Sequence, residues 1–488
     1  MKEIPSARRN PEPDRPANGP ENGEITPIRA LYIGNNRYPA GFTMHLRSQH
    51  NRSNPAMYRS VNRIEVRAWN RTVGAVTLDA ASGCCIFEYD PSWQAGGIEL
   101  APLTMPLAEA VHTFPLLPEA AFMRLPGLLA DSFPDGFAGR LIETCLAKEG
   151  LSPEAITPLD RLAYMGSSGM GALEFRPVRG PRFSKPKELE IDHLVAASNA
   201  VLAGNFHNDR ETEAATANLF QVGTSAGGEQ PKAVISWNEE TDEIRSGQLP
   251  AGPGFEHWII KLDGVGVEDE AANDCSAGRI EYAYSMMAKA AGIAMTECCL
   301  LEENGRAHFM ARRFDRREGE KLHMQSLCAL RHLDFTRRDA HDYDRYFETV
   351  GALGLPETAM QEAFRRMVFN VLAANCDDHT RQLSFLMDPD GNWSLSPACG
   401  LTHAFTPYGE WKFRHRMSVN GKFSDSSRED FDMVGRRFTV PDHESIISEV
   451  AEAVGRWPEF AAAARITPEA ALRIRQDFPN VIDARQNP

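Results

Sequence analysis

The chain has 488 residues, of which 42% are hydrophobic and 24% are charged. This length allows two or three hydrophobic cores, and the composition is ordinary for a globular protein, so general disorder is not expected. The 67 acidic residues outnumber the 52 basic ones and give a net charge of −15, which argues against direct electrostatic binding of DNA.

Cysteine usage and hydropathy indicate a reduced, cytoplasmic protein. The nine cysteines include the adjacent pairs Cys84-Cys85 and Cys298-Cys299, and the rest lack the spacing of a metal site. No stretch approaches the roughly eighteen consecutive apolar residues of a membrane helix, and the first residues lack the basic-then-apolar order of a secretion signal. We therefore expect free thiols, no membrane association and a cytoplasmic location.

Residues 1–58 form a proline-rich extension. Six prolines lie within the first 27 residues, among Asn, Gly, Glu and Arg. Such a segment cannot bury enough apolar surface to offset its chain entropy, so we expect the extension to be largely disordered.

A small β-rich subdomain is predicted over residues 59–180. Strand-like runs occur at 64–68, 73–78 and 84–89. Alternating apolar residues separated by short turns are typical of an antiparallel meander. A helix follows, with Asp135 as its expected N-cap and Gly150 as its expected C-cap.

Residues 181–318 have the element order of a nucleotide-binding lobe. A helix over 189–202 precedes the glycine-containing loop Gly223–Lys232. Further strands and one helix are expected at 233–237, 257–262, 281–292, 296–302 and 307–314. A loop, strands that carry lysine, one helix and more strands are the parts of such a lobe.

The last predicted unit, residues 319–488, is mainly helical. Helices are expected at 345–350, 356–374, 443–456 and 468–477. Two short strands should flank the turn at Asp388–Gly391. The overall expectation is an α+β protein.

The run Asn375–Gln382 concentrates carboxylates and a histidine directly after a long helix. Asp377 is placed to accept a proton from a substrate hydroxyl, as a general base must be. A phosphotransfer loop of this kind carries a metal-binding Asn five residues later, where this chain has Gln382. Two alternatives stay open for the run: a polar cluster that caps the helix, or a dinuclear hydrolase site with Asp377, Asp378 and His379.

Several separated motifs, in order, make the chain similar to the HipA family of toxin kinases. They are Leu128–Asp135, Gly223–Lys232, Ile259–Leu262, Glu281-Tyr282, Arg313–Arg316 and Asp377–His379. The resemblance implies a two-lobed, protein-kinase-like α+β fold with a β-rich N-terminal subdomain and a mainly helical C-terminal lobe. It also implies an ATP- and Mg²⁺-dependent serine/threonine protein kinase. The partners implied are a small helix-turn-helix antitoxin, DNA only through that antitoxin, and a protein substrate such as an aminoacyl-tRNA synthetase.

The same resemblance assigns the residues that bind nucleotide. They are Gly227, Gly228, Lys232, Lys261, Phe314 and Asp315. Glycines let backbone N–H groups approach phosphate oxygens, and the lysines add positive charge. Phe314 and Asp315 correspond to the turn that holds adenine and ribose. Thr224 or Ser225 occupies the place of an autophosphorylated serine.

Simpler interpretations of these residues stay open. Lys232 and Lys261 could reach solvent from a flexible loop and a strand end. Glu281 could pair with Lys261 or complement a helix dipole. The arginines around Asp315 could form a solvated ion-pair cluster at the surface, around one buried Phe.

The metal ligands depart from the pattern of the family. Gln382 is one methylene longer than Asn and is expected to hold a metal only weakly, and Gly400 stands where a second carboxylate belongs. Asp378, Asp388 or Asp390 are the substitutes within reach in the sequence. We expect a kinase fold with impaired phosphotransfer, or alternatively an inactive pseudokinase that serves as an antitoxin-binding co-repressor.

Overall fold

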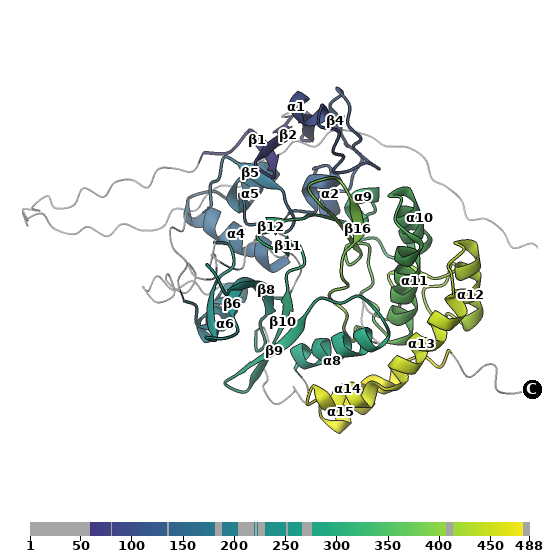
Figure 1. Ribbon diagram of the computed structural model, residues 1–488. Coiled ribbons are helices and arrows are strands. Elements are labelled where there is room, and N and C mark those ends of the chain that lie inside the picture. Colours follow the sequence, from purple (N-terminus) through teal and green to yellow (C-terminus); the bar gives the residue numbers. More distant parts are fainter. Residues whose placement is uncertain are drawn as a thin grey trace, which may run out of the picture. The chain divides into compact units, whose positions relative to one another are not determined.

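The computed structural model describes residues 59–79, 81–133, 136–180, 188–203, 219, 222, 230–249, 252–265, 276–406 and 413–481. Their strands form two five-stranded sheets and three smaller ones (Figure 1). Within these ranges, no helix has both the length and the apolar character needed to cross a bilayer. The extension 1–58, the cap Asp135 and the loop residues Thr224, Ser225, Gly227 and Gly228 lie outside the described residues.

The first sheet is antiparallel and has the strand order β4-β3-β2-β1-β5. Its strands are β1 (Arg63–Ala68), β2 (Arg71–Leu78), β3 (Cys85–Tyr89), β4 (His112–Thr113) and β5 (Glu174–Arg176). Ile64, Val66 and Ala68 are completely buried, whereas the residues between them are partly exposed. One face of the sheet therefore lies in the core, and the predicted meander is confirmed.

Short helices complete this part of the chain. They are α1 (Pro91–Gln94), α2 (Glu119–Phe122), α3 (Gly127–Ala130), α4 (Gly136–Lys148), η1 (Pro153–Ala155) and α5 (Pro158–Met165). The side chain of Thr157 accepts the N–H of Asp160 at the start of α5, and the Asp160 carboxylate accepts the N–H of Thr157. Asp160 also accepts the N–H of Val61, which ties β1 to this helix.

The second sheet is also antiparallel, with the order β7-β6-β8-β10-β9. Its strands are β6 (Lys232–Asn238), β7 (Glu243–Ser246), β8 (Glu256–Lys261), β9 (Cys298–Glu303) and β10 (Arg306–Arg312). Trp258 and Ile260 share a hydrophobic cluster with α6 (Ile191–Leu202). Because side chains alternate along a strand, Lys261 projects to the opposite face. That face is met by α8 (Ala277–Ala290), which contacts β9 and β10.

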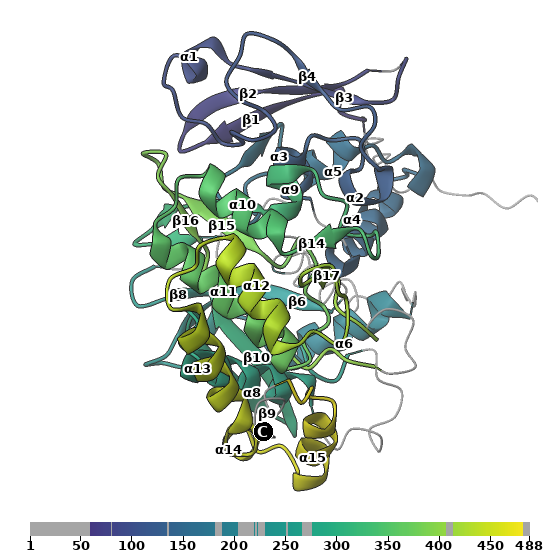
Figure 2. The ribbon, with the colours of Figure 1, turned by 90° about the vertical axis from the view of Figure 1, so that its right-hand side faces the viewer.

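The rest of the chain is mainly helical and shares one hydrophobic core with α8. Its helices are α9 (Leu327–Arg331), α10 (Asp344–Ala352), α11 (Glu357–Leu372), α12 (Arg428–Arg437), α13 (His443–Gly455), α14 (Trp457–Ala463) and α15 (Pro468–Gln476). Helix α13 contacts both α11 and α12 (Figure 2). Tyr284 and Met287 of α8 are completely buried in this core, so α8 connects the second sheet to the helices.

Three small sheets are formed by strands between residues 316 and 418. Their strands are β11 (Arg316–Arg317) with β12 (Glu320–Lys321), β13 (His323–Ser326) with β15 (Ser384–Met387) and β16 (Trp393–Leu395), and β14 (His341–Asp342) with β17 (Met417–Ser418). Strands β15 and β16 are antiparallel, and the N–H of Asp388 donates to the carbonyl of Asn392 between them. The hairpin expected at Asp388–Gly391 is confirmed.

Candidate functional site

Lys261 and Glu281 form an ion pair between β8 and α8. The Nζ atom of Lys261 lies 2.6 Å from each carboxylate oxygen of Glu281, which is only 5% exposed. Glu281 belongs to the second turn of α8, and the first turn carries no acidic residue. A role for Glu281 in complementing the helix dipole is therefore not supported. The structure therefore supports the ion pair, which is one of the two interpretations that the sequence left open.

Lys232 and Phe309 lie on either side of Lys261 in the second sheet. Lys232 pairs with Lys261 across β6 and β8, and Phe309 pairs with Lys261 across β10 and β8. Directly opposed residues on antiparallel strands project to the same side of a sheet. The face that meets α8 therefore presents two cationic side chains next to each other, and Lys261 Nζ is 5.8 Å from the centre of the Phe309 ring.

The loop 375–382 begins where α11 ends. Ala374 has a φ of 50°, which turns the chain out of the helix, and Asn375 then forms a bridge to Ala404. The N–H of Cys376 donates to the carbonyl of Ala404 at 3.2 Å, and the N–H of Ala404 donates to the carbonyl of Ala374 at 3.2 Å. These bonds hold the loop against the segment 398–404. The side chain of Asp377 is 38% exposed on this loop, and its Oδ1 lies 3.9 Å from Nε2 of His379.

Asp378, in contrast to Asp377, is buried and serves the fold of the loop. Its Oδ2 accepts the hydroxyl of Tyr343 at 2.8 Å and lies 3.0 Å from Nδ1 of His415, while its Oδ1 accepts the N–H of Arg416 at 2.7 Å. Asn370 in turn donates to the Tyr343 hydroxyl at 2.9 Å. Both oxygens of Asp378 are engaged, so it is a poor substitute for a missing metal ligand.

His415 is the cation that balances Asp378. Burial alone would lower the pKa of His415, but the adjacent carboxylate of Asp378 outweighs burial and raises the pKa to about 10. The imidazole is therefore protonated at neutral pH. Sequence reasoning missed His415, Tyr343 and Asn370, because each lies on a different element, between 8 and 37 residues from Asp378, and none belongs to a recognisable motif.

Gln382 and Gly400 are neighbours. A Cβ atom built on Gly400 would lie 2.8 Å from Oε1 of Gln382, 3.5 Å from its Cδ and 3.6 Å from its Nε2. The amide of Gln382 thus occupies the space into which a side chain at position 400 would project. Gly400 has a φ of 67°, a left-handed conformation that suits glycine.

The other candidate carboxylates do not replace the missing ligand. Asp388 uses Oδ1 to accept the N–H groups of Asp390 and Asn392, and uses Oδ2 to accept the Asn392 amide. Asp390 is exposed in the same turn. Among the described residues around the loop, Mg²⁺ would find the Asp377 carboxylate and the Gln382 carbonyl, whereas the ion prefers a near-ideal octahedral set of oxygens. These residues do not fit a magnesium site well.

Cys399 is the chain neighbour of Gly400. Burial raises the pKa of its thiol, and the positive charges of Lys261 and Lys232 act on the thiol in the opposite direction. Gly400 adjoins Gln382. The charges of the lysine pair thus act on the segment that contacts the loop 375–382.

Asp315 has a different environment from the one that a ribose contact requires. It is completely buried, and its carboxylate accepts Nε and Nη2 of Arg313 at 2.9 and 2.8 Å, Nη1 of Arg316 at 2.8 Å and the N–H of Gly171 at 2.7 Å. Burial opposes ionisation, but the two guanidinium groups hold the pKa of Asp315 well below its usual range. The arginines and Asp315 thus form an ion-pair cluster, but the cluster is buried and does not lie at the surface as expected. It joins the loop before β5 to β11. Phe314 beside it is partly exposed.

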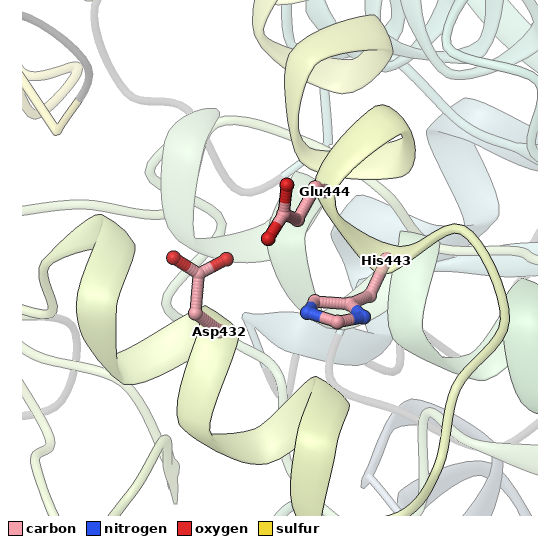
Figure 3. A group of neighbouring side chains, drawn as sticks. All are labelled: Asp432, His443 and Glu444. Carbon is pink, nitrogen blue, oxygen red and sulfur yellow. The ribbon is translucent and has the colours of Figure 1, made fainter.

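A second group of potential ligands lies between α12 and α13. One ligand atom each of Asp432, His443 and Glu444 lies within 4.8 Å of the others (Figure 3). Nδ1 of His443 is 3.2 Å from the carbonyl of Val440. Glu444 is exposed, and exposed acidic groups of this kind are common without an ion, so we assign no metal to this group.

Comparison with known proteins identifies the family. The HipA N-terminal domain model matches residues 64–176, and the HipA-like C-terminal domain model matches residues 224–457. No curated protein matches the chain in sequence. Among solved structures, a chain of the Shewanella oneidensis MR-1 toxin–antitoxin complex of HipA, HipB and operator DNA superimposes with a TM-score of 0.61. The match has 16% identity and covers 85% of this chain and 95% of that one.

A further structural match is the Helicobacter pylori proinflammatory kinase CtkA, with a TM-score of 0.28, 13% identity, and coverage of 45% of this chain and 91% of that one. At 16% identity, the Shewanella structure indicates the fold alone, and it confirms the predicted α+β class. The two domain models together include the first sheet, Lys261, Glu281 and the loop around Asp377. The chain therefore belongs to the HipA family of toxins.

Proposed function

We propose that this protein is the toxin of a type II toxin–antitoxin system and that its C-terminal site binds ATP and phosphorylates serine or threonine in a protein, with reduced turnover. The observation that carries this proposal is the Lys261–Glu281 ion pair between β8 and α8. In a kinase, such a lysine contacts the phosphates and is held in place by its glutamate.

Each residue has a defined role in the proposed reaction. Lys261 and Lys232 attract the phosphates, together with the glycines Gly227 and Gly228 of the preceding loop. Phe314 contacts the adenine. Asp377 accepts the proton of the attacking hydroxyl, for which its partial exposure is suitable. Thr224 or Ser225 is the proposed autophosphorylation position.

Reduced turnover is proposed because the metal donors are poor. Gly400 supplies no side chain, and both oxygens of Asp378 already accept hydrogen bonds. A carboxylate 4 Å from a single positive charge contributes about 4 kcal/mol at an effective dielectric of 20, and its loss near a dication weakens binding by two or more orders of magnitude.

The proposed partner is a small helix-turn-helix antitoxin. The Shewanella structure contains HipA, HipB and operator DNA. A net charge of −15 makes independent DNA binding by this chain unfavourable, so contact with DNA should run through the antitoxin. The proposed substrate is a protein of translation, such as an aminoacyl-tRNA synthetase.

A second candidate function is an inactive pseudokinase that binds the antitoxin as a co-repressor. The filled space at Gly400 favours it, since an enzyme that relies on a second metal ligand has no room for one there.

A γ-phosphate transfer assay with three proteins tests the proposal and separates it from the alternative. Weak transfer by the wild type that disappears in Asp377→Asn supports the reduced kinase. Transfer only by the double variant Gln382→Asn, Gly400→Asp supports the pseudokinase. Wild-type transfer as fast as that of the double variant would contradict the claim that the metal site is impaired.

A further inference from the structure

Gln382 and Gly400, the two departures from a kinase metal site, pack against each other. All three terminal atoms of the Gln382 amide lie within 3.6 Å of the Cβ position of Gly400. The missing side chain at residue 400 has therefore left no hole, because the longer side chain at residue 382 covers it. An uncharged amide stands where two metal ligands would meet.

In the proposed nucleotide site, this replacement changes the charge of the groups that would face the phosphates. A carboxylate next to a triphosphate repels it unless a cation lies between them. Gly400 and Gln382 carry no charge, and the charge of Asp378 is balanced inside the protein by His415. Asp377 is thus the carboxylate of the loop that a ligand would meet, and it is 38% exposed to screening by water.

The groups that would attract phosphate do not need a bound metal ion. Lys261 is fixed by two contacts of 2.6 Å to Glu281, and Lys232 leaves the sheet directly beside it. An amide can donate two hydrogen bonds to phosphate oxygens and needs no cation to do so.

We infer that this site binds nucleotide phosphates directly, without a divalent cation, with the Gln382 amide taking the place of the metal and its ligands. The inference rests on the proposed nucleotide site and specifies how that site differs from a metal-dependent kinase. Bound Mg²⁺ would lower the charge of ATP that the lysines attract, so the cation should not improve binding.

Isothermal titration calorimetry of the full chain with ATP, in Mg²⁺ and in EDTA, tests this inference. For the wild type, we expect dissociation constants that agree within about threefold or favour EDTA. The double variant Gln382→Asn, Gly400→Asp should bind ATP at least about tenfold more weakly in EDTA than in Mg²⁺, since a new carboxylate faces the phosphates. Lys261→Met should lose binding in both buffers.

The outcomes distinguish this inference from the proposed function. Wild-type binding that requires Mg²⁺ would overturn the inference and leave the proposed kinase intact. A folded wild type that binds ATP in neither buffer would overturn both. The comparison of the two buffers uses the wild type alone, so it remains decisive if the double variant does not fold.

Discussion

The buried pair of Asp378 and His415 should make the stability of this protein fall as the pH rises above neutrality. Burial opposes the charge of His415, but Asp378 outweighs it and raises the pKa of His415 to about 10 in the folded protein, against roughly 6.5 in an unfolded chain. Because the folded pKa is the higher one, the stabilisation is complete below about pH 6.5 and is lost as the pH approaches 10. Between pH 7 and pH 9, the loss from this group is about 2 to 3 kcal/mol.

Urea unfolding at pH 7, 8 and 9 measures this loss. The wild type should lose about 2 kcal/mol more than His415→Gln over this range, since the variant has no imidazolium to deprotonate. His323→Gln is a matched control: burial lowers the pKa of His323 to about 4, so this histidine is neutral throughout. Equal pH slopes for the wild type and His415→Gln would refute the assigned ion pair.

Three further substitutions test other parts of the site. Asp315→Asn should lower the free energy of unfolding by about 3 to 5 kcal/mol, because two buried guanidinium groups lose their carboxylate. A fall in ATP affinity without a loss of stability would instead indicate a ribose contact. Asp377→Asn should reduce phosphotransfer by at least about 100-fold while the melting temperature stays constant, since the side chain is 38% exposed. Gly400→Asp should destabilise the protein more when residue 382 is Gln than when it is Asn. A double-mutant cycle should give a coupling free energy of about 0.5 to 3 kcal/mol. Additive effects would show that the two side chains do not compete for the same space.

The strands and the positions of the site lysines could be predicted from local sequence patterns. Ile64, Val66 and Ala68 alternate with polar residues, and this alternation alone determines which face of β1 is buried. Lys261 ends a run of aromatic and β-branched residues, which places it at the end of β8. The ion pair with Glu281 required tertiary information, because a glutamate near a helix start has two physically reasonable roles.

The environment of Asp315 could not be read from its neighbours in sequence. Gly171, whose N–H donates to Asp315, lies 144 residues earlier in the chain. A run of arginines around one aspartate is equally compatible with an exposed charge cluster and with a buried one. The contacts of the loop 169–171 with Asp315 and Arg316 show that the buried carboxylate is used inside the protein.

The structural effect of Gln382 and Gly400 together differs from the effect that each residue would have alone. Taken alone, Gln382 is a conservative change that preserves an amide oxygen, and Gly400 is a simple deletion of a ligand. Their contact shows that the longer side chain occupies the room that the glycine provides. A close-packed interior stabilises such a pair as a unit, because restoring either residue alone creates a cavity or a clash. The space between residues 382 and 400 is therefore filled by an uncharged amide, and the proposed binding of a polyanion without its cation depends on this feature.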